Sequence, residues 1–428
     1  MYYNNTVKGI SVFCDILQVW LFGRLRNFEE HRRERVAKKV RVLHIAEAPG
    51  GVERYLVALL TKLKQNYSDE LEHVLVCSDS IDAGKFTGIV SKVEHVADMH
   101  HPISASADLR SVMEVRKLIS KYKPDIVYCH SSKAGAIGRL ANIGLKNREG
   151  KRNITVYNAH GWAFNMKGAD KKLIGSYVMI EKMLAPVTDS IVCISEFEKN
   201  TALAHEICEP SKLHVIYNGI DFDEECVAHT KPLDMNVIPD DAFVVGTVGR
   251  LATQKAPDIF VKAASIIKQR IPEAFFVIVG DGLNRKETEK LVNEYDLRDC
   301  FLITGWVNDP FNYICNFDVA MLMSRWEGFG LVLPEYMLIK KPIVASNVDA
   351  IPEIIQDGVN GLLVEREDYY GAAEAVVRLH DDPELREYLV KNEEKIVKDR
   401  FNVERTAREH RDLFMKLTGW EEKSGKKG

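Results

Sequence analysis

The sequence lacks the features that mark several large classes of protein. Its eight cysteines are scattered over 428 residues without a C-x-x-C pair or a Cys/His cluster, so we expect neither a zinc site nor a disulfide framework. We expect them to be reduced thiols in the core of a cytoplasmic protein. The net charge of −4 provides no basic field for nucleic acid, which excludes that partner. Dinucleotide G-x-G-x-x-G, Walker, G-x-S-x-G and H-E-x-x-H motifs are also missing, which disfavours the corresponding enzymes, dehydrogenases included.

Long apolar runs are missing as well. The longest at the N-terminus, residues 9–23, is shorter than the roughly 20 residues that a membrane-spanning helix needs. Basic residues follow it in residues 24–41 instead of preceding it, which is not the order of a secretory signal. Residues 1–39 are therefore predicted to be an N-terminal extension. Its apolar and basic runs fit peripheral docking on the anionic inner face of the plasma membrane, and equally a helix packed on the protein itself.

What is present, from Val40 onward, is a regular alternation of short apolar runs with amphipathic helical patterns. Continuous apolar runs are typical of parallel strands covered on both faces, and the alternation predicts right-handed βαβ units in doubly wound α/β sheets. We predict strands at 40–46, 73–78, 125–130, 154–159, 190–195, 213–217, 243–249, 274–280, 301–304, 318–323, 342–346 and 361–364.

The strand pattern stops in a polar, turn-rich stretch, which divides the chain into two Rossmann-like halves facing each other across a cleft. The predicted parts are the extension 1–39, an N-terminal domain 40–222, a linker 223–240, a C-terminal domain 241–400, a C-terminal helix 401–418 and a tail 419–428.

Residues 324–337, SRWEGFGLVLPEYM, place Glu327 and Glu335 around a glycine turn in an otherwise apolar run. The turn joins a strand to a helix, so Gly328 and Gly330 lie where backbone must approach a ligand. The helix N-terminus favours phosphate, and the two carboxylates can accept hydrogen bonds from hydroxyl groups. The alternative is that Glu335 merely complements the helix dipole and Glu327 lies on the surface.

Two cations follow another strand end, in VGTVGRLATQKAP. Arg250 can bind a diphosphate as a bidentate fork and Lys255 as a point charge, whereas surface salt bridges are the alternative. A further glycine turn, with Gly280, ends the next strand. In the first half, Gly50 and Gly51 precede a helix and leave room for a substrate.

Two histidines, His130 and His160, end strands of the first half, and we expect both to point toward one cleft edge. A structural role is the alternative for each. The D-x-D of residues 221–223 matches a metal-binding pattern of some sugar transferases. Because it lies where the linker begins, we predict no metal site there.

The segments PGGVE, NAHGW, VIYNGID, VGRLATQK, GDG and EGFGLVLPE together resemble the retaining glycosyltransferases of family GT4, which have the GT-B fold, over residues 40–415. HSSKAG and NAHGW further resemble bacterial members that build capsular and exopolysaccharides.

The resemblance implies roles for individual residues. Arg250 and Lys255 would hold the diphosphate, Glu335 the ribose and Glu327 the donor hexose. His160 would lie beside the reacting carbon, so that catalysis depends on His160, Glu327, Arg250 and Lys255. The remaining implied contacts are Gly280, Gly328, Phe329, Gly330 and Leu331 on the donor side, and Gly50, Gly51, Glu53 and His130 on the acceptor side.

The expected activity is transfer of a hexose, with retention, from a nucleotide-diphosphate sugar to a saccharide or polyprenyl-diphosphate-linked acceptor. No cofactor and no metal are expected. Two alternatives stay open, a nucleotide-sugar epimerase or hydrolase of the same fold and a non-catalytic partner subunit that keeps the fold.

Overall fold

The computed structural model describes residues 39–47, 49–99, 104–221, 238–307 and 309–420. The predicted N-terminal extension and its membrane contact lie outside the described residues, apart from the last residues of the basic run, where Val40 and Arg41 begin the first strand. Within the described part of the chain, no helix is both long and apolar enough to span a bilayer. The six described cysteines are free.

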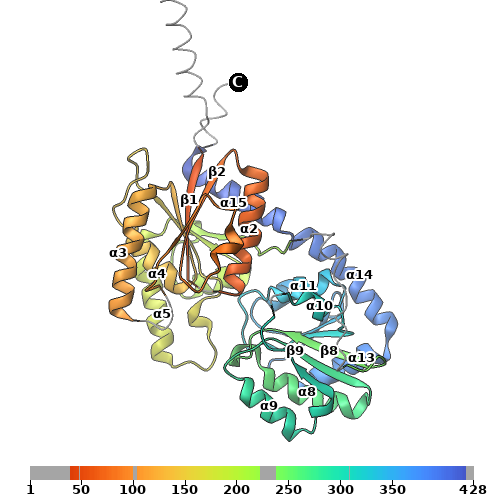
Figure 1. Ribbon diagram of the computed structural model, residues 1–428. Helices are drawn as coiled ribbons and strands as arrows, with labels where there is room; N and C mark the ends of the chain where they lie inside the picture. The colour runs from red at the N-terminus through yellow and green to blue at the C-terminus, as the bar shows by residue number, and fades with distance from the viewer. Residues whose placement is uncertain (1–38, 48, 100–103, 222–237, 308, 421–428) are drawn as a thin grey trace, which may run out of the picture.

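The N-terminal domain is built on a seven-stranded parallel sheet in the order β3-β2-β1-β4-β5-β6-β7 (Figure 1). Its strands are β1 Val40–Ala46, β2 Leu71–Cys77, β3 Lys92–His95, β4 Ile126–His130, β5 Ile154–Asn158, β6 Ser190–Cys193 and β7 Leu213–Val215. Its helices are α2 Gly51–Tyr67, α3 Ala105–Tyr122, α4 Ser132–Ala141, α5 Lys171–Leu184 and α6 Glu196–Ala204. Separate apolar clusters fill the two faces of the sheet, as expected for strands covered on both sides.

The C-terminal domain has a six-stranded parallel sheet in the order β10-β9-β8-β11-β12-β13. Its strands are β8 Phe243–Val248, β9 Ala274–Val279, β10 Phe301–Ile303, β11 Val319–Leu322, β12 Ile343–Ser346 and β13 Leu362–Val364. The following helices are α8 Pro257–Arg270, α9 Arg285–Glu294, α10 Phe311–Ile314, α11 Val332–Leu338, α12 Ile351–Ile354, α13 Tyr369–Asp381, α14 Pro383–Arg400 and α15 Val403–Thr418.

The predicted fold class, two doubly wound α/β domains, is confirmed. Each of the twelve predicted strands is present, with ends that differ by about two residues at most. The prediction missed β3, whose sequence KVEH is polar. At the edge of the sheet its residues are only partly buried, so the apolar signal of a central strand is missing.

The last helix returns to the first domain. Figure 1 shows α14 running along the C-terminal domain and α15 lying beside α2 of the N-terminal domain. Where the chain crosses back, the Ile220 N–H donates to the Phe401 carbonyl (2.8 Å) and the Val403 N–H to the Ile220 carbonyl (3.0 Å). A Cβ on Gly219 would lie 2.5 Å from the Asn402 backbone, so the two crossing segments are in direct contact.

Candidate active site between the two domains

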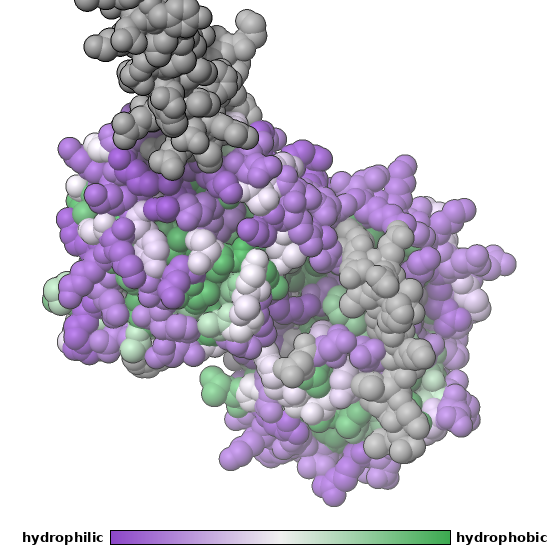
Figure 2. All heavy atoms as spheres, turned by 45° about the horizontal axis from the view of Figure 1, so that its top comes forward, coloured by the Kyte–Doolittle hydropathy of each residue, from purple (hydrophilic) through white to green (hydrophobic). Residues whose placement is uncertain are grey.

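The two domains face each other across a hollow, visible in Figure 2, that contains a cavity of about 1640 Å³. The turns that follow β1, β5, β8 and β11 all contribute to its lining. Ligands of doubly wound sheets bind at these carboxyl ends of the strands, so the cavity lies where the topology predicts a site.

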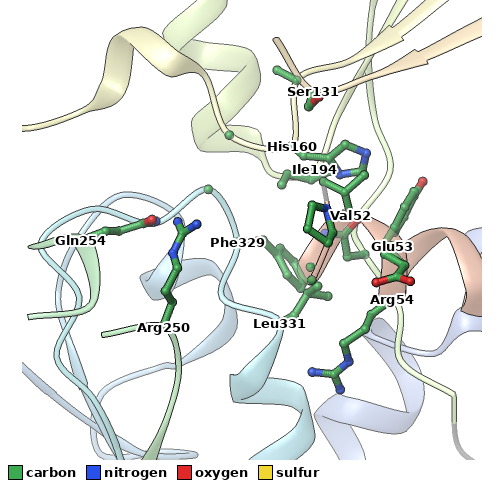
Figure 3. A pocket seen from close by; sticks show the side chains of 18 of the residues that line it. Val52, Glu53, Arg54, Ser131, His160, Ile194, Arg250, Gln254, Phe329 and Leu331 are labelled. Atoms are coloured by element: carbon green, nitrogen blue, oxygen red, sulfur yellow. The ribbon is translucent and has the colours of Figure 1, made fainter. Parts of the chain in front are cut away.

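Two cations line the C-terminal side of this cavity. Arg250 follows β8, is exposed, and has neither a hydrogen bond nor an ion pair with the described residues, and its side chain extends into the cavity (Figure 3). Lys255 ends a short turn before α8, and its Nζ donates to Glu327 Oε2 at 2.6 Å. One cation is therefore free and the other is held by a carboxylate.

Glu327 follows β11 and is only 8% exposed. Besides Lys255, the Ser324 hydroxyl donates to its Oε2 (2.9 Å), and its own N–H donates to Asp349 Oδ2 (2.9 Å). These contacts fix the carboxylate beside the cation at the cavity wall. The alternative, that Glu327 lies on the surface, is therefore wrong.

The glycine turn after Glu327 touches the opposite domain. A Cβ on Gly328 would lie 2.9 Å from Gly161 Cα, a separation that real Cβ atoms do not reach, and the Ser195 hydroxyl donates to the Gly328 carbonyl (3.2 Å). Gly330 has φ of 88°. Phe329 is buried, and it lines the cavity together with Leu331 and the two glycines.

Glu335 in the first turn of α11 is 3% exposed. Its Oε1 forms an ion pair with Arg54 of α2, whereas its Oε2 is buried and has no hydrogen-bond partner among the described residues. Burial raises the pKa of Glu335, and Arg54 opposes that shift. A buried acceptor without a partner at a cavity wall is suited to a ligand hydroxyl.

His160 lines the cavity in a left-handed backbone conformation, with φ of 52°. The Asn158 side chain accepts from its N–H at 2.9 Å, and Glu198 accepts from the N–H groups of Gly161 (2.6 Å) and Ile194 (2.8 Å). Burial raises the pKa of Glu198 to about 7. Strained residues persist where the surroundings hold them, which is typical of functional sites.

His130 does not lie where the sequence analysis expects it. It is fully buried behind His160 and does not line the cavity, so its predicted place at the acceptor side of the cleft is wrong. The reason is the pleat, because the last side chain of β4 points inward and the next residue, Ser131, reaches the cavity.

The remaining predicted residues line the cavity. Gly50 directly precedes α2 and has φ of 82°, and a Cβ on it would lie 3.9 Å from the Trp306 ring of the other domain. Gly51 follows it, and Glu53 accepts from the Asp82 N–H (3.2 Å) and contacts Lys85. Gly280 is needed for packing, since a Cβ there would lie 2.0 Å from the Gly249 carbonyl oxygen.

Sequence reasoning missed Arg54 and Trp306. Arg54 is three residues beyond the Gly50–Gly51 turn, and a cation in the first turn of a helix is unfavourable to the dipole, which could have marked it. Trp306 is a 67% exposed aromatic residue shortly after β10.

No group of three or more metal-ligating side chains occurs among the described residues. Of the D-x-D pattern, Asp221 forms an ion pair with Lys62 (3.0 Å), whereas Phe222 and Asp223 lie outside the described residues.

Two family models match the chain. Residues 49–224 match Glycosyltransferase Family 4, and residues 233–396 match Glycosyl transferases group 1. A protein of the Klebsiella pneumoniae cps region is 30% identical over 79% of this chain and 89% of its own length. The chain belongs to the GT4-type glycosyltransferases.

A relative of this glycosyltransferase with a named activity is the Escherichia coli UDP-Gal:alpha-D-GlcNAc-diphosphoundecaprenol alpha-1,3-galactosyltransferase, 29% identical over 89% of this chain and 97% of the relative. Among solved structures, Anabaena HepE in complex with UDP and glucose superposes with a TM-score of 0.72 at 20% identity, covering 88% of this chain and all of HepE. Sucrose-phosphate synthase of Thermosynechococcus elongatus gives 0.75 at 20% identity, covering 89% of this chain and all of that structure. Both likenesses support the two-domain fold.

Proposed function

We propose that this glycosyltransferase moves a hexose, with retention, from a nucleotide-diphosphate sugar to a lipid-linked saccharide in cell-surface polysaccharide synthesis. The observation that carries the proposal is the arrangement of charges along one cavity wall. The unpartnered Arg250 and the Glu327-bound Lys255 line the same cavity as two buried carboxylates, one of which, Glu335, has a free oxygen. Two cations together with two acceptors suit a pyrophosphate that carries hydroxyl-bearing rings.

In this mechanism, Arg250 and Lys255 stabilise the negative charge that grows on the departing pyrophosphate. Glu335 accepts hydrogen bonds from the ribose, and Glu327 from the hexose. His160 and the Gly328–Gly330 turn enclose the reacting carbon. Contact of the glycine turn with Gly161 helps to exclude water, which would hydrolyse the donor.

The engagement of the cavity carboxylates by other groups supports front-face attack. In this mechanism the leaving phosphate takes the proton of the acceptor hydroxyl. A double displacement needs an unengaged carboxylate as nucleophile. The described carboxylates of the cavity wall have partners in Ser131, Lys85, Lys133, Arg139, Lys62, Lys255, Arg54 and the Glu327 N–H. Because these carboxylates are engaged, the epimerase and hydrolase alternatives are also disfavoured. Those enzymes need free acid and base groups across the cleft. We expect transfer to persist in the presence of a chelator.

An apolar surface on the N-terminal domain supports a lipid-linked acceptor. We call this surface the apolar rim; it consists of the exposed side chains Leu109, Met113, Leu140, Ile143, Leu173, Met179, Ile180 and Met183 of α3, α4 and α5 and the loop after α4. Three of them, Leu109, Leu140 and Ile180, also line the cavity, so the rim is continuous with the site. Exposed apolar patches of this kind mark interaction surfaces. The lipid-linked substrate in the name of the Escherichia coli relative agrees with this assignment.

Thermal shift with a panel of nucleotide-sugars tests the donor site. A bound nucleotide-sugar should raise the melting temperature by mass action, and Lys255→Ala should abolish turnover chiefly through weaker donor binding, by about 10²–10³-fold. Glu327→Ala should lower turnover while the protein stays folded. Lys290→Ala, on the exposed face of α9, is the matched control. Normal transfer by both cavity variants would refute the site.

The double substitution Met179→Gln and Met183→Gln tests whether the acceptor is lipid-linked. These exposed side chains can change without disturbing the core, since α5 is anchored by the buried ion pair between Glu181 and Arg139 (2.8 Å). KM should rise for a polyprenyl-linked acceptor and stay unchanged for a water-soluble analogue. Tyr388→Gln, on the exposed side of α14, is the control. An equal KM for the lipid-linked acceptor would argue against the apolar rim.

A further inference from the structure

Four histidines form a hydrogen-bonded row through the interior of the N-terminal domain. His73, His44 and His130 belong to the adjacent strands β2, β1 and β4, and His160 follows β5 at the cavity. The nitrogen-to-nitrogen distances are 3.0 Å for His73–His44, 3.1 Å for His44–His130 and 3.1 Å for His130–His160. The first three rings are at most 4% exposed, so the row runs along one face of the sheet, from the cavity to β2, through protein alone.

The row couples the protonation sites of its members. A neutral imidazole has one N–H and one lone pair, so each ring must donate on one side and accept on the other. Burial lowers the pKa of all four rings, to about 3 for His73 and His160, which keeps them neutral near pH 7. Three successive bonds between neutral rings therefore have only two arrangements, one the reverse of the other.

The far end of the row distinguishes the two arrangements. His73 Nε2 is buried and has no partner among the described residues. A buried N–H without an acceptor is more costly than a buried lone pair without a donor, so Nε2 of His73 is the unprotonated nitrogen and its Nδ1–H donates to His44 Nε2.

The same direction follows along the whole row. His44 Nδ1–H donates to His130 Nε2, and His130 Nδ1–H donates to His160 Nε2. The proton of His160 is then on Nδ1, which makes no hydrogen bond with the described residues. His160 therefore presents an N–H donor, not an acceptor, to whatever occupies the cavity.

The surroundings of the row help to hold this arrangement. Tyr55 packs edge-on against His160, with ring centroids 4.7 Å apart. The Tyr55 and Tyr128 hydroxyls lie 2.9 and 3.0 Å from Nε2 of His410 on α15, and the other nitrogen of His410 donates to the Thr406 carbonyl (2.8 Å). The tyrosines therefore bind His410 and leave the nitrogens of the row to one another.

We propose that His73, His44 and His130 are positioning residues, which fix His160 as the neutral ring whose Nδ1–H donates a hydrogen bond to an oxygen of the donor sugar. The role of His160 toward the sugar rests on the proposed function. The tautomer does not, because it is a property of the unliganded protein.

Selective ¹⁵N labelling of the histidines tests the tautomer directly. Two-bond ¹⁵N–¹H correlations distinguish an Nδ1–H from an Nε2–H ring, and His160→Gln identifies the signal by its loss. We expect the Nδ1–H form in the unaltered protein. His44→Leu breaks the row without touching the cavity, and should shift His160 toward the other tautomer and lower kcat about tenfold, with the Kd of the nucleotide unchanged.

Two further variants separate positioning from loss of packing. His44→Gln retains one donor and one acceptor at similar spacing and should restore most of the tautomer and of kcat. His380→Gln, in the C-terminal domain, is the control and should change neither. If the His44→Leu protein does not fold, His73→Leu is used in its place. This substitution costs less, because the Nε2 of His73 has no hydrogen-bond partner to lose.

An Nε2–H ring in the unaltered protein, or an unchanged His160 signal in the variant, overturns the inference. Failure of the protein to bind any nucleotide-sugar would instead overturn the proposed function and leave the tautomer result standing.

Discussion

Arg54 of α2 and Glu335 of α11 form an ion pair between the two domains, although 281 residues separate them in the chain. The Arg54 side chain is 48% exposed, whereas that of Glu335 is 4% exposed. The arginine can therefore leave for water at small cost, while the carboxylate cannot. Arg54 favours the ionised form of Glu335, and under the proposed function it would give way to the ribose hydroxyls.

Removal of Arg54 should make donor binding pH-dependent. Burial already raises the pKa of Glu335 and Arg54 opposes it, so Arg54→Ala should raise this pKa further. As the pH falls through the raised pKa, the carboxyl becomes protonated and accepts hydroxyls poorly. We expect the Kd of the nucleotide-sugar to weaken as the pH falls, by about tenfold once the carboxyl is protonated, measured by calorimetry over a series of pH values. Arg54→Lys retains the charge and is the control; an equal pH profile for both variants would contradict the role.

Gly328→Ala should separate donor binding from transfer. The added methyl would meet Gly161 of the other domain at 2.9 Å, so the domains could not approach as closely. The proposed donor-binding wall lies within the C-terminal domain and stays intact. We expect kcat to fall at least tenfold, since overpacking costs about 1–3 kcal/mol, with a nearly unchanged Kd for the nucleotide-sugar. Gly175→Ala, on α5 with no atom within 4 Å of the added Cβ, is the control.

Glu393 should make stability fall as the pH rises. It is fully buried on α14, both of its oxygens lack partners among the described residues, and burial raises its pKa well above the ordinary value. The folded protein therefore holds a proton that the unfolded chain loses near pH 4.3, so stability is greatest below that pH and declines up to the raised pKa.

Glu393→Leu should raise the free energy of unfolding at pH 8 by about 1–3 kcal/mol and reduce this pH dependence, as measured by urea unfolding at several pH values. Glu387→Leu makes the same change on the exposed side of α14 and should alter neither. A Glu393→Leu protein less stable than the parent at pH 8 would show that the carboxyl has a favourable partner.

The sequence predicts much of the fold because most strands are fully buried, and buried parallel strands have continuous apolar runs. It also predicts the cavity wall around Glu327 and Glu335, because glycine turns at strand ends mark close backbone approach. Arg54 is harder to predict, because the only local signal is its unfavourable place in the first turn of a helix, and its partner is contributed by the other domain.

The histidine row could not be predicted either. His44 and His73 are single polar residues within apolar runs, and their side chains meet only through the register of β1 with β2 and β4. His130 shows the same limit, because which side of a strand end faces the cleft depends on the pleat and not on the residue type.

Because α15 packs on the N-terminal domain, that domain is complete only after the C-terminal domain has been synthesised. Leu413, Phe414 and Met415 of α15 belong to the apolar cluster that also contains Tyr55 and Leu56 of α2. During translation that face of α2 stays uncovered until the ribosome has synthesised α15. Premature termination after residue 400 would therefore release a protein with both sheets complete but with the apolar face of α2 uncovered, which chaperones would recognise by its exposed apolar surface.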